Sequence, residues 1–266
     1  SLHVKLVGAS GNDTAMSSGG TGTTFEFDYN FSTDVSYYWG QFNGGDGGDA
    51  KKNGEDANAY DGGSGGNALY LGTILKGNVS NNNINEIICI AAGGGGAGAQ
   101  MTGGSADILV DISDTAFFGY SGGNGGIGYR SNGQYGKGGT ITYLDTPNIN
   151  GSGSIGHGNN SRGGDRLYGS GGGGAGIYGG KADFNRTLND ADGGGAGASI
   201  LSRAVTSRSV FNTLIATKDA SIEITYKSRN LSSTKTNGRI YIYEYNDNSR
   251  FINVNYDYYD NDGTLT

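Results

Sequence analysis

Proline, cysteine and histidine are nearly absent from this chain of 266 residues, which has one Pro, one Cys and two His. Collagen is excluded, because its Gly-X-Y repeat requires abundant proline. A single cysteine cannot form an intramolecular disulfide, and the position of Cys89 between Ile88 and Ile90 predicts an inert thiol in a buried strand. A metal site built from His and Cys ligands is out of reach, so we expect no metal.

Clusters of positive charge and long apolar runs are also missing. The formal net charge is -7, and lysine and arginine do not gather anywhere along the chain. Binding to nucleic acid or to an acidic membrane surface normally requires such a basic patch. No apolar run approaches the roughly 20 residues of a membrane span. We therefore expect neither nucleic-acid binding nor membrane insertion.

Glycine, by contrast, accounts for 54 residues, and the sequence IICIAAGGGGAGAQ at 87–100 raises the question of its role. Gly93, Gly95 and Gly98 have the spacing G-x-G-x-x-G of a dinucleotide-binding turn. Such a turn must open a helix, but Gly103 and Gly104 follow almost at once and ADILVDI then looks like a strand. No run matches GxxxxGK[ST] either. We therefore expect no nucleotide and no other cofactor.

The glycine runs fall into two families. GGDGGDA (44–50), GGSGGNA (62–68) and GGNGGIG (122–128) carry a side chain at every third position, whereas GGGGAGA (93–99), GGGGAGI (171–177) and GGGAGA (193–198) carry nothing larger than alanine before their ends. A period of three is typical of the polyproline II conformation, which makes no internal hydrogen bonds, so such segments would have to pair with one another.

The first family would then lie outside a bundle, with Asp46, Asp49, Ser64, Asn67 and Asn124 facing solvent, and the second family would form its interior. Flexible linkers are the alternative interpretation of the same runs. The predicted polyglycine core is Gly93, Gly94, Gly95, Gly96, Gly98, Gly171, Gly172, Gly173, Gly174, Gly193, Gly194 and Gly195.

Short β-branched or aromatic segments bounded by Gly or Asn predict an all-β protein. The expected strands are 3–7, 23–29, 35–39, 84–90, 106–112, 140–144 and 221–226. The segment 210–216 is the best candidate helix, of one or two turns, because Val210, Phe211, Leu214 and Ile215 recur at helical spacing.

Catalytic and calcium-binding patterns are weak. Only His3 and His157 could act as acid or base near neutral pH, and no serine has the GxSxG context of a nucleophile, so we expect no enzyme. The run GGDGGDAKK at 44–52 has Lys51 where a calcium β-roll needs an apolar residue. The tail DYYDNDG at 257–263 departs from EF-hand spacing. Candidate glycosylation sites in N-x-[ST] context are Asn12, Asn30, Asn78, Asn150, Asn159, Asn185 and Asn230.

A resemblance rests on the order of several segments over residues 1–226: SLHVKLVGASGN, GGTGTTFEFDYNF, GGDGG, IICIAAGGGGAGA, GGGAGASIL and ASIEITYK. This layout resembles the glycine-rich extracellular domain of the anaplastic lymphoma kinase and leukocyte tyrosine kinase receptors and of microbial glycine-rich relatives. The resemblance implies a jelly-roll-like β-sandwich with a bundle of polyglycine II helices inserted between its strands, and an extracellular or cell-surface location. The family's disulfides and kinase segment are missing here, so receptor signalling is not implied.

Beyond Tyr226 the glycine runs end and the composition changes. We expect a second region at 227–266 with a polar linker, a β-hairpin and an acidic tail. RIYIYEY and RFINVNY alternate with period two around NDNS, and a hairpin of this kind must pack on the main domain or add to a neighbour's sheet. The candidate assembly residues are Tyr241, Tyr243, Tyr245, Phe251, Val254 and Tyr256.

Two functions from different classes remain open. The first is a non-enzymatic structural subunit that assembles with itself into a surface fibre or matrix. The second is an adhesin or receptor-like recognition module that binds glycan or protein through its glycine-loop tips. For this second function the contact residues would be Tyr129, Tyr135, His157 and Tyr168.

Overall fold

The computed structural model of the chain is all-β and consists of antiparallel sheets, which confirms the predicted fold class. It describes residues 1–32, 35–52, 55–56, 61–110, 112–127, 136–161, 168–182, 192–213, 219–226, 229–233, 237–244 and 252–257. Only the backbone is described for 51–52, 55–56, 226 and the segments from 229 onwards. In the described part, no helix has the length and apolar character needed to cross a membrane.

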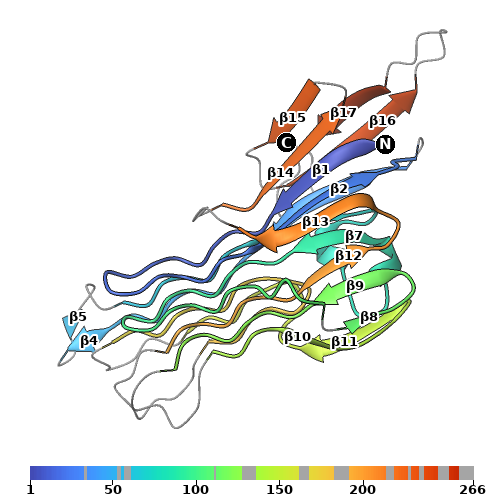
Figure 1. The fold of residues 1–266 in the computed structure, drawn as a ribbon. Helices are drawn as coiled ribbons and strands as arrows, with labels where there is room; N and C mark the ends of the chain where they lie inside the picture. Colours follow the sequence, from blue (N-terminus) through green and yellow to red (C-terminus); the bar gives the residue numbers. More distant parts are fainter. Residues whose placement is uncertain are drawn as a thin grey trace.

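Two antiparallel sheets form the body of the molecule (Figure 1). The five-stranded sheet has the order β13-β2-β1-β14-β15, with β1 at Leu2–Val7, β2 at Thr23–Tyr29, β13 at Thr206–Asn212, β14 at Ser221–Tyr226 and β15 at Arg229–Ser233. The eight-stranded sheet has the order β17-β16-β3-β6-β7-β12-β9-β8. Its strands are β3 (Tyr37–Phe42), β6 (Ala68–Gly72), β7 (Ile87–Ala91), β8 (Ile112–Ser113), β9 (Phe117–Tyr120), β12 (Ser199–Ser202), β16 (Asn237–Glu244) and β17 (Ile252–Asp257).

Smaller elements complete the fold. They are the hairpin of β10 (Thr140–Asp145) and β11 (Asn148–Ser152), the short pair β4 (Lys51–Lys52) and β5 (Glu55–Asp56), and the 3-10 turns η2 (Lys76–Asn78) and η3 (Ile84–Glu86).

The centre of the eight-stranded sheet is covered on both faces, and every residue of β6 and β7 is buried. Side chains alternate between the faces of a strand. On β6, Leu69 and Leu71 join a core with Val4 and Phe25 of the five-stranded sheet, whereas Tyr70 joins a second core under the β10–β11 hairpin. A side chain such as Phe25, which is fully buried, stabilises the fold by about 1.5–3 kcal/mol through removal of apolar surface from water.

The predicted helix at 210–216 is wrong. Strand β13 continues through Asn212 and pairs Val210 with Phe25 of β2. Residues 214–218 lie outside the described residues. Pairing along the edge of β2 and contact of Val210 with the core outweigh the helical spacing of four apolar residues.

The strand expected at 106–112 is also largely wrong. Ala106 makes an isolated bridge to Gly122, and among the described residues of this range only Ile112 belongs to a strand, β8. Between them the Asp107 carboxylate accepts a hydrogen bond from the Leu109 N–H at 2.8 Å, so a local turn replaces the ladder. The apolar side chains of 108–110 are consequently exposed.

Other boundaries shift or were missed. The expected strand 35–39 lies at 37–42, and 84–90 divides into η3 and β7. The strands at 68–72, 117–120, 148–152 and 199–202 were not expected, because they are short and end against glycine runs or turns. The linker expected after Tyr226 contains β15, which pairs with β14. The hairpin of β16 and β17 is confirmed in its backbone pairing, and it extends the eight-stranded sheet through β3.

The glycine runs extend from one end of the sandwich as long, nearly parallel segments that belong to no named strand or helix (Figure 1). Several are continuous with a strand: 92–99 follows β7, 192–198 precedes β12, and 121–127 follows β9. The run at 171–177 instead adjoins the isolated bridge of Tyr178. The sheets therefore fix one end of each run that adjoins a strand.

Candidate functional site

The glycine runs and the segments hydrogen-bonded to them form a single structure, which we call the glycine array. The run at 92–99 exchanges backbone hydrogen bonds of 2.7–3.0 Å with six other segments. Its N–H groups donate to 169–175, 9–12 and 104, and its carbonyl oxygens accept from 20–23, 63–66 and 194–197. The backbone polar groups of a fully buried segment are thus satisfied without any sheet ladder.

The hydrogen bonds repeat every three residues. Along this run every third N–H donates to the same neighbouring segment. With each step of three residues forward along the run, the acceptor is three residues further back along that neighbour. The donors are Gly93, Gly96 and Ala99, and their acceptors are Ala175, Gly172 and Gly169. A period of three is that of an extended threefold helix whose successive groups point in three directions.

The other two runs of the same family have the same environment. The segment 169–177 donates to 192–198, 63–66 and 159, and accepts from 45–48, 93–99 and 180. The segment 193–198 donates to 123–126, 93–96 and 178–181, and accepts from 104, 136–139 and 174–177. The three runs are also bonded to one another, so they form the centre of the array.

Glycine is required here by close approach. A Cβ atom placed on Gly95 would collide with the carbonyl oxygen of Gly194, and one on Gly172 would collide with that of Gly45. Every residue of the predicted polyglycine core is buried, and so are Ala97, Ala175 and Ala196 within the same runs.

The GGxGGx runs lie at the periphery. Over 43–48 the residues cycle twice through exposed, half-buried and buried. Asp46, Asp49 and Asn124 are exposed as expected, whereas Ser64 and Asn67 are half-buried. Asn67 faces inward in part, because its Nδ2 donates to Gln41 Oε1 at 3.0 Å and its Oδ1 accepts from the Gly44 N–H.

An open groove of about 670 Å³ lies beside one peripheral run and includes His157. The imidazole of His157 and the ring of Phe42 form a T-shaped pair with 5.9 Å between their centroids. The N–H of Asp46 donates to Asn160 Oδ1, which fixes one wall of the groove against the other. The groove is lined by Asn43, Gly44, Asp46, His157, Gly158, Asn159 and Asn160.

Tyr168 does not line this groove, and Tyr129 and Tyr135 lie outside the described residues. The three neighbours Asn43, Asp46 and Asn160 were not singled out as ligand-binding residues from the sequence. Asn160 belongs to the same loop as His157, but Asn43 and Asp46 come near it through pairing between segments more than 100 residues apart, which spacing along the chain cannot reveal.

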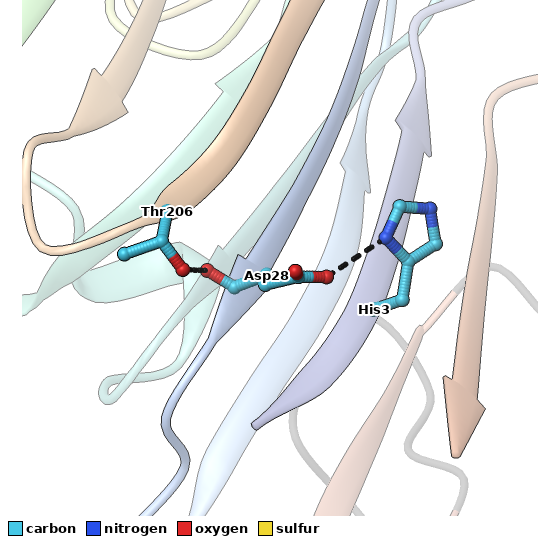
Figure 2. Close-up of polar contacts among 3 residues, drawn as sticks. All are labelled: His3, Asp28 and Thr206. Carbon is cyan, nitrogen blue, oxygen red and sulfur yellow. Dashed lines mark hydrogen bonds and ion pairs between the residues drawn. The ribbon is translucent and has the colours of Figure 1, made fainter. Parts of the chain in front are cut away.

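The second histidine, His3, contacts a carboxylate on the neighbouring strand. Figure 2 shows its ring beside Asp28, with Nδ1 at 2.9 Å from Oδ1, while the backbone oxygen of Asp28 accepts from Thr206. His3 and Asp28 are directly opposite in the β1–β2 register. The described residues also contain no group of three or more His, Cys, Asp or Glu side chains arranged to hold a metal ion.

Four of the six candidate assembly residues are described, and they lie on the two strands at one end of the eight-stranded sheet. Tyr241 and Tyr243 are on β16, and Val254 and Tyr256 are on β17. Tyr245 and Phe251 lie outside the described residues. In the described part of the chain β17 pairs only with β16, so its other side is an open sheet edge.

The candidate glycosylation sites differ in access. Asn12, Asn30, Asn78 and Asn150 are exposed. Asn159 is half-buried, and its Oδ1 accepts a hydrogen bond from the Ser154 hydroxyl at 3.2 Å. Asn185 lies outside the described residues, and of Asn230 only the backbone, on β15, is described.

Searches of protein-family models and of curated proteins give no match to this chain. The class is therefore defined by the fold: an antiparallel β-sandwich that carries a hydrogen-bonded array of glycine segments.

Proposed function

We propose that the chain is a non-enzymatic, extracellular structural subunit that assembles with itself into a surface fibre or matrix. The observation that carries this proposal is the open edge of the eight-stranded sheet at β17. An unpaired edge offers a row of N–H and C=O groups to a strand of another molecule.

The glycine array supports a structural role. We propose that its segments are polyglycine II helices, as the resemblance to glycine-rich ectodomains implies, and that they act as a stiff extension of the sandwich. The three-residue period and the six hydrogen-bonded neighbours of each central run support this conformation. Ordering so much glycine has a large entropic cost, which only dense mutual hydrogen bonding can offset.

Negative-stain electron microscopy of the purified protein tests the assembly. Truncation after Lys227 alone is a poor probe, because it also removes β15 and β16 and uncovers β14 and β3. A sharper pair is Asn253→Pro and Val254→Pro. Adjacent residues of an antiparallel edge strand point their N–H groups alternately toward the partner and away from it.

One proline variant is expected to lose filaments while its melting temperature stays near that of the wild type, since it removes only an outward N–H. The other removes a β16–β17 hydrogen bond and serves as the stability control. Filaments in both variants would contradict assembly through this edge. Discrete particles from the unmodified protein would contradict the fibre altogether.

The groove beside His157 favours a second candidate function, a recognition module for glycans. Its side chains supply both hydrogen-bond donors and acceptors: the amides of Asn43 and Asn160, the carboxylate of Asp46 and the imidazole of His157. Binding of neutral saccharides by isothermal titration, lost in Asp46→Ala and kept in Asp49→Ala, would favour this function. Equal binding by both variants would count against it.

A further inference from the structure

Two arginines share one aromatic ring at the surface of the sandwich. The Cζ atom of Arg203 lies 3.8 Å from the centroid of the Phe118 ring, and that of Arg208 lies 3.5 Å from it. Two guanidinium groups at these spacings cannot occupy the same side, so they cover opposite faces of the ring. Phe118 is on β9, Arg208 is on β13, and Arg203 is in the connection between β12 and β13.

Both arginines are exposed, and neither guanidinium forms an ion pair with a described residue. The acidic side chains of the adjoining strand β2 form ion pairs with residues of β1 instead. Asp28 pairs with His3 at 2.9 Å (Figure 2), and Glu26 pairs with Lys5 at 3.0 Å. Two cations without an ion-pair partner among the described residues thus lie together in a protein of net charge -7.

The backbone between the arginines is irregular. The β13–β2 register shifts between Thr206 and Ser209, and Ser207 has φ of 49°, an uncommon conformation for a residue other than glycine. A bulge re-aims the side chains beside it, and backbone strain of this kind often accompanies binding sites. It also leaves the residues Ser207 and Ser209 exposed next to Arg208.

We propose that Arg203, Phe118 and Arg208 form a binding site for an acidic polysaccharide, whose sulfate or carboxylate groups pair with the two guanidiniums. A planar guanidinium binds an oxyanion through two parallel hydrogen bonds. Because the two groups are separated by the aromatic ring, they suit two anionic groups spaced along one polymer better than a single small anion. The exposed serines suit the hydroxyls of a sugar. The site is independent of the assembly proposed above.

Binding of dextran sulfate and of a polyuronate to the full chain tests this site, with neutral dextran as the negative probe. Arg203→Ala and Arg208→Ala are each expected to weaken binding about tenfold or more. Lys181→Ala, which removes one exposed positive charge from the glycine array, is expected to change affinity less than twofold. Binding by the wild type should also weaken as salt screens the charges.

Arg208→Lys separates the proposed site from general electrostatics, because it keeps the charge and loses the planar fork. It is expected to bind several-fold more weakly than the wild type, with an unchanged melting temperature as evidence of folding. Full affinity in both alanine variants, or equal losses in Lys181→Ala, would overturn the site. Binding of poly-aspartate but of neither polysaccharide would overturn the assignment to a saccharide.

Discussion

The N–H of Gly194 donates a hydrogen bond of 2.9 Å to the carbonyl oxygen of Gly96, whose own N–H donates to Gly172 at 2.8 Å. This chain of contacts joins the three central glycine runs. The backbones come so close that no side chain fits between them, and the array can be loosened by a single methyl group at its centre.

Gly95→Ala is expected to destabilise the protein by about 3 kcal/mol or to prevent folding, since its Cβ would collide with the Gly194 carbonyl oxygen. The matched control is Gly77→Ala in η2, where an added Cβ would meet no atom within 4 Å. It is expected to change the free energy of unfolding by less than about 0.5 kcal/mol. Denaturant unfolding measures both, and equal stabilities would contradict close packing of the array.

Amide hydrogen exchange distinguishes an ordered array from flexible linkers. The amides of 93–97, 172–175 and 193–198 all donate backbone hydrogen bonds in the interior, so we expect slow exchange, comparable with that of β7. The amides of Gly47 and Asp49 donate no hydrogen bond to the described residues and are expected to exchange quickly. Uniformly fast exchange across all glycine runs would show that they are linkers.

Much of the fold could be predicted from local sequence. Alternating β-branched and aromatic residues identify β1, β2, β10 and β14 nearly to their ends, and the three-residue glycine period indicates which runs lie outside. These features depend on the nearest few residues. They are therefore visible without any knowledge of tertiary contacts.

Features that depend on distant pairing could not be predicted. Val210 and Phe211 share helical spacing with Leu214 and Ile215, yet they pair with the edge of β2 and form part of a strand. Ile108 to Val110 have strand-like side chains, yet the Asp107 carboxylate closes a turn there. The groove at His157 and the arginines on Phe118 are each assembled from segments far apart in the chain.

Cys89 is expected to be unreactive in the folded protein. It is fully buried on β7, and burial raises the pKa of its thiol well above the ordinary value, so little thiolate is present. Labelling with a disulfide reagent at pH 8 should be at least about a thousandfold slower in native buffer than in guanidinium, because it requires opening of the sheet. Rapid labelling of the native protein would contradict a closed core around β7.

The Asp114 carboxylate ties two turns together. Its Oδ1 accepts from the N–H groups of Ala116 and Phe117 at 2.8 and 2.6 Å, at the start of β9. Its Oδ2 accepts from the N–H and the hydroxyl of Thr146, in the turn between β10 and β11. Partial burial by itself raises the pKa of Asp114, but these four hydrogen bonds together bring it below the ordinary value.

A lowered pKa in the folded state gives a defined pH dependence. The ionised carboxylate contributes stability above its unfolded pKa of about 4, and this contribution is lost as the pH falls through the folded pKa. Asp114→Asn is expected to lower the free energy of unfolding by about 1–2 kcal/mol at pH 7, because an amide nitrogen replaces one accepting oxygen. The difference from the wild type should shrink as the pH falls toward 2.

Asp49→Asn provides the control, since Asp49 is exposed and its carboxylate accepts no hydrogen bond from the described residues. It is expected to leave stability nearly unchanged at both pH values, which separates the hydrogen bonds of Asp114 from the general effect of removing a negative charge. A loss of stability in Asp114→Asn that is the same at pH 7 and pH 2 would mean that the ionised form contributes nothing. The link between the β8–β9 turn and the β10–β11 hairpin would then depend on side-chain packing alone.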